Sequence, residues 1–169
     1  YSESRQIDED DRILAENYLE YVKDIDSSKW TRSWIRGGIE ELKDSLAVKN
    51  TIPNVSAVLF RRESLLLILK NELDFISSFK VAGDWAVYYK LLSCGGKVSF
   101  VHYPLNNHRR HSDSVTISSY GEELVLEIIR MQIEISRNVN PTAKASAIAR
   151  QYIFHLNKQF GIEQIRGAT

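Results

Sequence analysis

Apolar residues recur at intervals of three and four positions along much of this chain, which is the spacing of one face of an α-helix. In the last third, one such face is formed by Leu124, Ile128, Met131 and Ile135. Beyond Pro141, which is tolerated in the first turn of a helix, the spacing is repeated by residues 148, 152, 156 and 160. The pattern predicts two long amphipathic helices, each of which must bury its apolar face against another element.

The middle of the chain alternates between helical and extended patterns. An apolar stripe over residues 85 to 92 is helical and is stopped by two glycines, so Asp84 is placed at the amino terminus of this helix. Residues 97 to 103 are rich in β-branched and aromatic side chains and predict a strand, which a polar loop over residues 104 to 116 follows. Two further elements are predicted upstream, a buried strand over residues 55 to 60 and a helix over residues 63 to 73.

The amino-terminal part of the chain predicts two more helices. The acidic run at residues 8 to 11 precedes helically spaced apolar residues, so residues 1 to 29 are assigned to an amino-terminal helix with negative charge at its favourable end. The helical spacing continues over residues 30 to 46, although two glycines weaken the middle of that second helix.

Together these elements predict a helix-rich α+β fold, with about five to six helices and two or three short strands in one domain over residues 1 to 169. Two strands alone make a poor sheet, since isolated pairs are marginal in water. The strands are therefore expected to lie at the edge of a sheet whose centre belongs to a portion before Tyr1. The start at Tyr1 and the single methionine, Met131, favour the same interpretation of an excised piece of a longer polypeptide.

Composition excludes several classes of protein. Lys and Arg number 22 and Asp and Glu number 22, so the chain lacks the positive field that holds a nucleic acid, and no nucleic-acid partner is expected. A single cysteine, Cys94, excludes an intramolecular disulfide and a cysteine-only metal cluster, and we expect it to be buried. The sequence has no run of about 18 apolar residues and no signal peptide, so neither a membrane span nor export is predicted.

Three short stretches carry the most specific information. They are Asn-Val-Ser-Ala-Val-Leu-Phe-Arg-Arg at residues 54 to 62, Ala-Gly-Asp-Trp at residues 82 to 85, and Pro-Leu-Asn-Asn-His-Arg-Arg-His-Ser-Asp-Ser-Val-Thr at residues 104 to 116. Together they resemble the second half of family 2 glycosyltransferases of the bacterial cell-surface polysaccharide type, which have the GT-A fold. The resemblance is best over residues 34 to 116. It implies a catalytic and acceptor part at residues 30 to 116 and a helical tail at residues 117 to 169.

In the family that this chain resembles, a carboxylate at a helix start acts as catalytic base, and Asp84 is the only acid in the matching motif. Many relatives have a pair of acidic residues there, so this chain departs from the pattern. An acceptor hydroxyl has a pKa far above neutrality, and its attack on the anomeric carbon needs a carboxylate to take the proton. The helix start is expected to keep Asp84 ionised through the helix dipole and free amide groups. The alternative is that Asp84 is only a helix cap, which contributes about 1 kcal/mol of stability.

The same resemblance implies that a later histidine helps to hold the donor diphosphate or a divalent metal, Mn or Mg. His111 in the string Arg109-Arg110-His111 matches that motif, and the two arginines suit the charge that develops on the leaving group. His108 is a rival imidazole three positions earlier, and the sequence leaves open which of the two faces the site. The alternative for the arginines is a solvated loop face.

Three further residues are candidates for binding the acceptor sugar. Asn54 and Ser56 could hydrogen-bond its hydroxyl groups, and Trp85 could offer an apolar face to a sugar ring. Trp85 could equally belong to the core. Asn54-Val-Ser56 is formally a glycosylation sequon, which we interpret as coincidence in a chain without a secretory signal.

The resemblance also implies what this chain lacks. Family members bind the nucleotide through an amino-terminal α/β half with an Asp-x-Asp motif, and the nearest string here, Asp24-Ile25-Asp26, follows a predicted helix rather than a strand. The isolated chain is therefore expected to be inactive. The whole enzyme would move a sugar from a nucleotide-sugar donor to a glycan or lipid-linked acceptor, in the cytoplasm or against the inner face of the membrane.

A second hypothesis belongs to another class, a non-catalytic helical interaction module of a multidomain polysaccharide-synthesis protein. Its support is the helical pattern at both ends, residues 7 to 25 and 124 to 160, which could pair with another chain. Self-association is a further expectation, because residues 55 to 60 and 98 to 101 are apolar segments that so short a sheet leaves uncovered.

Overall fold

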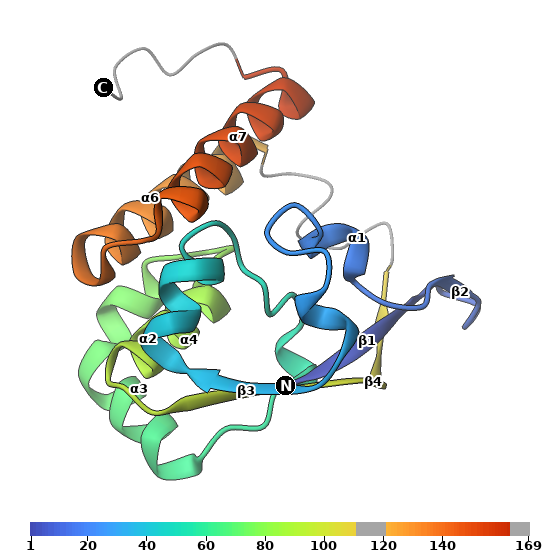
Figure 1. The fold of residues 1–169 in the computed structure, drawn as a ribbon, viewed down its shortest axis with the longest axis horizontal. Helices are drawn as coiled ribbons and strands as arrows, with labels where there is room; N and C mark the ends of the chain where they lie inside the picture. Colours follow the sequence, from blue (N-terminus) through green and yellow to red (C-terminus); the bar gives the residue numbers. More distant parts are fainter. Residues whose placement is uncertain (111–120, 163–169) are drawn as a thin grey trace.

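The computed structural model describes residues 1 to 110 and 121 to 162, which form a mixed four-stranded sheet with helices packed against it (Figure 1). The strands lie in the order β2-β1-β4-β3. This is the helix-rich α+β class that the sequence predicts. The strands are β1 (Ser2–Ile7), β2 (Ile13–Ala15), β3 (Trp34–Gly37) and β4 (Lys97–Arg109). The helices are α1 (Leu19–Val22), α2 (Gly38–Glu41), α3 (Arg62–Ser77), α4 (Gly83–Ser93), α6 (Gly121–Val139) and α7 (Ala143–Phe160).

Strand β4 organises the sheet because it pairs with two different partners along its length. Its first residues run antiparallel to β3, with Trp34 opposite Phe100. From Val101 onward it runs parallel to β1, and the amino group of Tyr1 donates a hydrogen bond to the Ser99 carbonyl oxygen (2.8 Å). Strand β2 lies at one edge, antiparallel to β1. The sheet therefore has more strands than the two or three expected.

The prediction of a helix over residues 1 to 29 is wrong. This segment forms β1, a turn, β2 and only the short helix α1. The acidic run makes the turn, since the Asp8 carboxylate accepts hydrogen bonds from the N–H groups of Asp10 and Arg12 (both 2.9 Å) and Asp11 has a φ of 64°. Aspartate side chains that bond to the backbone in this way compete with helix formation. Strand β1 is then stabilised by β4, a partner far along the chain that local spacing does not reveal.

The second predicted helix, residues 30 to 46, is wrong in its first half. A 3₁₀ turn (Lys29–Thr31) and β3 come first, and α2 starts only at Gly38 before it continues in wider π-helical turns to Leu46. A Cβ atom added to Gly38 would lie 3.0 Å from the Leu92 carbonyl oxygen. Gly38 is therefore a point of close approach between α2 and α4, and not the weak centre of a longer helix.

The apolar run at residues 55 to 60 is not a buried strand. Val55–Ala57 forms a single 3₁₀ turn, and Leu59 is 96% exposed. The side-chain oxygen of Asn54 closes the turn, because it accepts hydrogen bonds from the N–H and the hydroxyl of Ser56 (3.2 and 2.6 Å). Other exposed apolar side chains lie on the strands at Ile13, Leu14, Ile35, Tyr103 and Leu105. Self-association through such side chains stays a prediction.

The other predicted elements are confirmed, with shifted ends. Helices α3, α4, α6 and α7 lie where the spacing places them, and β4 begins as predicted but continues to Arg109, into the segment expected to be a loop. Helix α4 ends before Gly95 and Gly96, whose φ angles of 88° and 85° suit glycine. Cys94 at this end is exposed, contrary to expectation, because it lies beyond the last packed turn. No helix among the described residues is long and apolar enough to cross a membrane.

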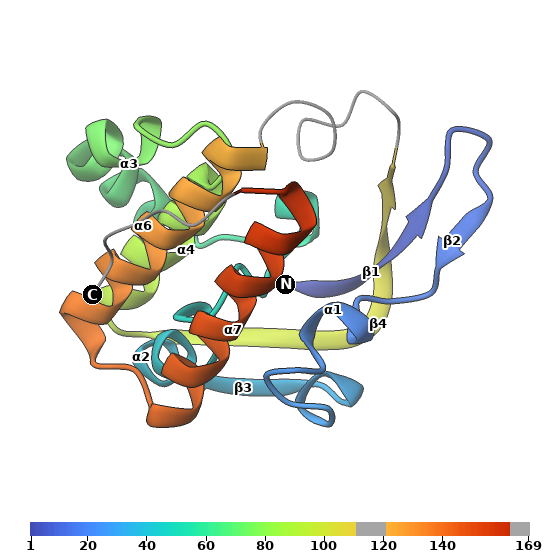
Figure 2. The ribbon, with the colours of Figure 1, turned by 90° about the horizontal axis from the view of Figure 1, so that it is seen from above.

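Two apolar clusters form the core. The larger one joins α4, α6, α7 and the π-helical turns, and its most buried large side chains include Trp85 and Met131. The smaller one joins the sheet to α7 and contains Trp30, Phe100 and Ala145. Helices α6 and α7 pack side by side, and α6 lies against α4 and the π-helical turns (Figure 2). The carboxy-terminal helices thus cover the same core that holds α4 in place.

Candidate functional site

The start of α4 is fixed by a carboxylate that comes from α6. Glu127 accepts hydrogen bonds from the backbone N–H groups of Lys80, Val81 and Ala82 at 2.7, 2.8 and 2.8 Å. These N–H groups immediately precede α4, where a helix leaves donors without intrahelical partners. Glu127 therefore holds the approach to α4 and, with it, the position of Asp84 in the first turn.

The carboxylate of Asp84 is half-buried and has one hydrogen-bond donor on each oxygen. Its Oδ1 atom accepts from the N–H of Trp85 (2.6 Å), and its Oδ2 atom accepts from the side-chain amide of Asn50 (3.2 Å). Burial raises the pKa of Asp84, and these hydrogen bonds oppose the increase. The expectation that the helix start simply favours the ionised form is thus corrected, because loss of solvent outweighs the donors. The result is a more basic carboxylate than an exposed aspartate.

Two tyrosines lie close to this carboxylate. Tyr88, one helical turn beyond Asp84, is 2% exposed, and its hydroxyl has no hydrogen-bond partner in the described part of the chain. Burial and then the charge of Asp84 raise the pKa of Tyr88. Tyr21 belongs to α1. Its pKa is raised by burial and by its neighbours Tyr152, Asp24 and Asp84. Asp84 therefore lies near two tyrosine side chains, one from α4 and one from α1. The hydroxyl of Tyr88 has no hydrogen-bond partner among the described residues.

The segment that carries Asn50 is anchored by its neighbour Lys49. The Lys49 ammonium donates to both carboxylate oxygens of Asp24 (2.7 and 2.9 Å). It also lies 4.6 Å from the ring centroid of Tyr21 and 4.9 Å from that of Tyr152, within the range of cation–π attraction. This packing connects residues 49 and 50 to α7 and to the end of α1.

At the end of β4, His108 and Arg110 lie near Tyr18, whose ring lies close to that of Tyr21. The Tyr18 hydroxyl and His108 Nδ1 are 2.5 Å apart, and the Tyr18 and Tyr21 ring centroids are 6.3 Å apart. The pKa of Tyr18 is raised by burial, while the nearby charge of Arg110 lowers it. His108 and Arg110 thus lie on the side of Tyr18, while Asp84 lies near Tyr21.

Arg109 does not belong to this group. Its guanidinium donates to the carbonyl oxygens of Asp8 and Glu9 (2.7 and 3.2 Å) and to the carboxylate of Asp11 (2.5 Å). These partners form the turn between β1 and β2. The alternation of side chains along β4 sends Arg109 away from the direction of its neighbours. Arg109 therefore holds a turn, and the predicted diphosphate contact has no support from its position.

His111, the main candidate for a metal or diphosphate contact, lies outside the described residues. Residues 1 to 110 and 121 to 162 contain no group of three or more His, Cys, Asp or Glu side chains that could hold a metal ion. The string Asp24-Ile25-Asp26 has other roles, because Asp24 pairs with Lys49 and Asp26 accepts the N–H groups of Ser28 and Lys29 (2.8 and 2.9 Å). The described side chains therefore do not fit a metal centre by themselves.

The three predicted sugar contacts differ in exposure, since Ser56 is exposed while Asn54 and Trp85 are buried. Trp85 is 1% exposed and lies in the larger core cluster, so the prediction of a sugar platform is wrong. Asn54 and Ser56 are bonded to each other in the 3₁₀ turn, although the Asn54 amide nitrogen has no partner in the described structure. The local reason is that the apolar run after Asn54 turns instead of extending, which keeps both polar groups near their own backbone.

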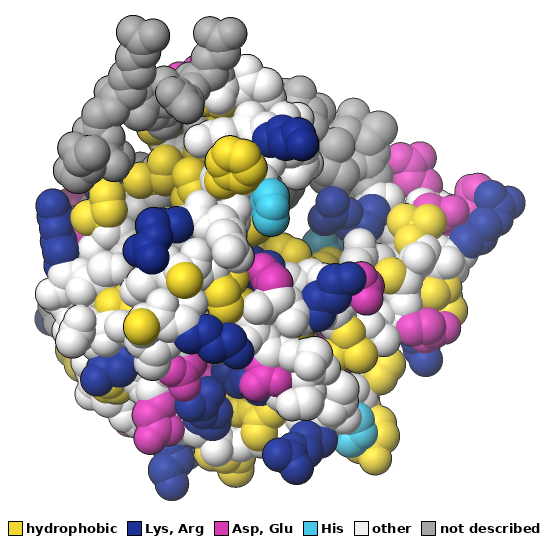
Figure 3. All heavy atoms as spheres, turned by 45° about the horizontal axis from the view of Figure 1, so that its top comes forward, with side chains coloured by type: hydrophobic (Ala, Val, Ile, Leu, Met, Phe, Trp, Pro, Cys, Tyr) yellow, Lys and Arg dark blue, Asp and Glu magenta, His cyan; other side chains and the backbone are white. Residues whose placement is uncertain are grey.

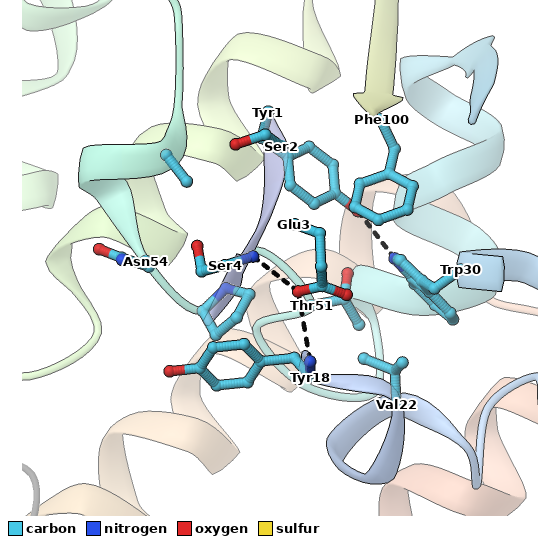
Figure 4. A pocket seen from close by; sticks show the side chains of 12 residues that line it. Tyr1, Ser2, Glu3, Ser4, Tyr18, Val22, Trp30, Thr51, Asn54 and Phe100 are labelled. Carbon is cyan, nitrogen blue, oxygen red and sulfur yellow. Dashed lines mark hydrogen bonds between the residues drawn. The ribbon is translucent and has the colours of Figure 1, made fainter. Parts of the chain in front are cut away.

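A small cavity lies between this turn and β1 (Figure 4). Its walls include Glu3, Tyr18, Thr51 and Asn54, and the Glu3 carboxylate accepts the N–H groups of Ser4 (2.8 Å) and Tyr18 (3.2 Å). The volume open to a water-sized sphere is about 10 Å³, which is enough for about one water molecule and far too small for a sugar ring.

The face on which the carboxy-terminal helices come forward is hollowed near its centre (Figure 3). Basic, acidic and histidine side chains are intermixed around the hollow, and no single charge sign covers the face. On this face the described residues therefore form no extended surface of one charge sign.

The structure places His108 and Arg110 near Tyr18 and Asp84 near Tyr21, and it leaves Arg109 and Trp85 out of these surroundings. Asn50 and Tyr88 also lie beside Asp84, and neither is predicted from the sequence. Tyr88 lies four positions after Asp84, a helical spacing that could have identified it. The only sequence feature that marks Asn50 is its position just before the segment broken by Pro53, and this does not indicate a contact with Asp84. Comparison of the chain with protein-family models, curated proteins and solved structures gave no match.

Proposed function

We propose that this chain is the carboxy-terminal, acceptor-side part of an inverting glycosyltransferase that uses a nucleotide-sugar donor, and that Asp84 is its catalytic base. The observation that carries the proposal is the environment of the Asp84 carboxylate. It lies in the first turn of α4, its pKa is raised by burial, and one N–H donor fixes each oxygen. Each oxygen keeps capacity to accept a further hydrogen bond, as a base requires.

The reaction needs a single proton acceptor on the acceptor side. The acceptor hydroxyl oxygen forms a bond to the anomeric carbon while the bond from that carbon to the donor phosphate oxygen breaks. The proton of the hydroxyl moves to Asp84, and the nucleoside diphosphate leaves with the electron pair. Attack opposite to the leaving group inverts the anomeric configuration. A base with a pKa closer to neutrality gives a stronger driving force for this transfer than an exposed aspartate.

The end of β4 is proposed to face the leaving group. Arg110 and His108 supply groups that stabilise negative charge, and His111 follows them in the sequence. Arg109 is omitted from this role because its donors are used in the β1–β2 turn. A divalent metal, Mn or Mg, stays part of the proposal for the whole enzyme, and the described residues of this chain would need further ligands to hold it. The nucleotide-binding half is proposed to come from another part of the polypeptide, with the reaction in the cytoplasm, where nucleotide sugars are available.

The alternative of a helical interaction module loses part of its support. Its first helical end, residues 7 to 25, is mostly strand and turn. Its second end, α6 and α7, packs onto the chain's own core through Val125, Met131 and Leu156. Outside that core, however, α6 and α7 expose Leu126, Ile133 and Phe154, so the alternative keeps an apolar surface at the carboxy-terminal end.

The direct test is Asp84→Asn in a polypeptide that includes the nucleotide-binding half. Loss of the base should lower the rate of sugar transfer by about 100-fold to 10,000-fold and leave donor affinity nearly unchanged. Asp74→Asn on the exposed side of α3 is the matched control, since it makes the same chemical change away from the site. Transfer by Asp84→Asn within a few-fold of the unmodified enzyme would remove Asp84 from the mechanism.

A further inference from the structure

We infer that Asn50 is a positioning residue for Asp84, which holds one carboxylate oxygen so that the carboxylate presents a fixed direction to an incoming hydroxyl. The contact itself stands on the structure, and its catalytic consequence rests on the function proposed above. Among the described residues, Asn50 provides the only side-chain hydrogen bond to the Asp84 carboxylate. The other donors are backbone N–H groups, those of Trp85 and of Asp84 itself, which no side-chain substitution removes.

The orientation of the Asn50 amide is set by its two ends. Its nitrogen donates to Asp84 Oδ2 (3.2 Å), while its oxygen accepts the N–H of Ile52 (3.2 Å). An amide carries donors at one end and acceptors at the other, so the Ile52 bond requires that the NH₂ group faces Asp84. A reversed amide would place two acceptor oxygens against each other and lose the Ile52 bond.

The backbone around Asn50 is held on both sides. Lys49 is anchored by Asp24, and the next two residues, Thr51 and Ile52, are buried. An amide on so constrained a segment cannot follow the carboxylate if the carboxylate moves. Asn50 therefore restrains Asp84 rather than the reverse.

The remaining groups around Asp84 do not offer the same restraint. Tyr88 from α4 and Tyr21 near the end of α1 are the titratable side chains whose pKa values respond to its charge, and the Lys49–Asp24 pair lies beyond Tyr21. The Tyr88 hydroxyl has no hydrogen-bond partner in the described structure, so it does not fix the carboxylate. Loss of the Asn50 donor should leave one oxygen of Asp84 unrestrained in a poorly solvated place.

The consequence for catalysis follows from geometry. A base must lie within hydrogen-bond reach of the proton that it takes, and a displacement of about 1 Å can cost about 100-fold in rate. The amide also stabilises the ionised form of Asp84, because it donates to the charged group. Removal of Asn50 should therefore raise the pKa of Asp84 and move the acidic limb of the rate profile to higher pH.

The experiment compares Asn50→Asp and Asn50→Ala with the unmodified chain. Asn50→Asp keeps the oxygen that accepts from Ile52 and replaces only the donor, so two carboxylates face each other and the pair should titrate with one clearly raised apparent pKa. Asn50→Ala removes the donor without adding charge and should raise the pKa of Asp84 less. The titration is followed through the ¹³C signal of the Asp84 carboxyl carbon in the 169-residue chain, with no need for activity.

Asn138→Asp is the control for an added carboxylate, since Asn138 donates instead to the Tyr89 hydroxyl (2.7 Å) and is exposed. It should leave the titration of Asp84 unchanged. A purely structural role for Asn50 predicts a lower melting temperature with no change in that titration. An unchanged pKa of Asp84 in folded Asn50→Ala would overturn the inference, even where Asn50→Asp fails to fold.

The catalytic part is measured in the polypeptide with the nucleotide-binding half. Asn50→Ala should lower kcat by about 10-fold to 100-fold at a pH where Asp84 is ionised, with KM for the donor nearly unchanged. An unchanged kcat would reject the positioning role in catalysis. If the unmodified polypeptide transfers no sugar, the proposed function fails instead, and the carboxyl titration alone then decides the contact between Asn50 and Asp84.

Discussion

Two carboxylates meet the start of α4, one from α6 and one from α4 itself. Glu127 is 8% exposed and accepts three backbone N–H groups, so its oxygens are well supplied with donors. Asp84 is half-buried and accepts two, while the hydroxyl of Tyr88 beside it has no partner among the described residues. Glu127 thus has more backbone donors than Asp84, and in the described structure an unpartnered hydroxyl lies beside Asp84 alone.

The difference suggests a structural role for Glu127 and a chemical role for Asp84. A buried charge is tolerated when donors replace the water that it loses, and a group so satisfied has little left to offer a substrate. A carboxylate with fewer donors is more basic and can still accept a proton. The same two features, a raised pKa and unused hydrogen-bonding capacity, are typical of functional sites. This contrast yields predictions for five substitutions, which complement the tests above.

The largest expected effect on stability is that of Glu127→Ala. Three backbone N–H groups at the approach to α4 lose their acceptor, and we expect the free energy of unfolding to fall by about 2–4 kcal/mol. Denaturant titration measures this loss. Glu123→Ala, four positions earlier on α6, removes only a partly exposed ion pair with Lys80 and should cost less than about 1 kcal/mol. Equal losses from the two substitutions would mean that Glu127 is not a structural cap.

The second prediction uses pH to reverse the sign of an effect. The pKa of Asp84 is raised in the folded chain by burial, so the neutral form is favoured by folding and stability is lost as pH rises through that pKa. Asp84→Asn should therefore gain melting temperature relative to the unmodified chain between about pH 3 and pH 7. The measurement is the difference in melting temperature between variant and unmodified chain at several pH values.

Asp26 gives the opposite case in the same chain. Its pKa is lowered, first by the hydrogen bond from the Ser28 N–H, so its contribution to stability is present above its unfolded pKa and lost in acid. Asp26→Asn should therefore lose melting temperature relative to the unmodified chain as pH rises from about 3 to 7. If both variants change in the same direction, the contrast between a carboxylate whose pKa is lowered by hydrogen bonds and one whose pKa is raised by burial is not the correct explanation.

The fold could be predicted from the sequence where local spacing and core packing agree. Helices α3, α4, α6 and α7 have their own apolar faces, and glycines mark the end of α4. The prediction for residues 1 to 29 is wrong because the structure of this segment depends on contacts with residues far along the chain. Residues 8 to 11 have the composition of a helix start, yet Asp8 bonds to the backbone of a turn and β1 gains its partner from β4. Side-chain bonds to the backbone and non-local strand pairing are not visible in periodicity.

The candidate site could be predicted only in part for a related reason. Asp84 was identified from a motif at a helix start, and the structure places it there. Trp85, one residue later, points to the core because consecutive helical residues face in directions about 100° apart, so the motif carried no information about which side chain is exposed. Asn50 was missed because its role depends on a contact across 34 positions. Burial and contacts between residues far apart in the sequence set the chemistry of such a site.

The smallest expected effect is that of Arg109→Ala, and it extends the comparison from carboxylates to cations. Like Glu127, Arg109 has several hydrogen-bond partners. Its guanidinium contacts two carbonyl oxygens and the Asp11 carboxylate in the β1–β2 turn. Both members of its ion pair are substantially exposed, so its loss should lower the free energy of unfolding by less than about 1 kcal/mol. It should also leave donor affinity unchanged in a polypeptide with the nucleotide-binding half.

Arg110→Ala is the matched substitution, because the neighbouring side chain lies near Tyr18 and not in the turn. We expect it to weaken binding of the nucleotide-sugar donor by about 5-fold to 10-fold, the size of one partly exposed charged contact to a phosphate. Titration of each variant with the donor separates the two arginines, and an unchanged melting temperature for Arg110→Ala excludes misfolding. Weaker donor binding in Arg109→Ala with none in Arg110→Ala would show that a cation with satisfied partners can still serve the donor. The principle drawn from Glu127 and Asp84 would then not extend to the end of β4, and Arg109 would return to the diphosphate site.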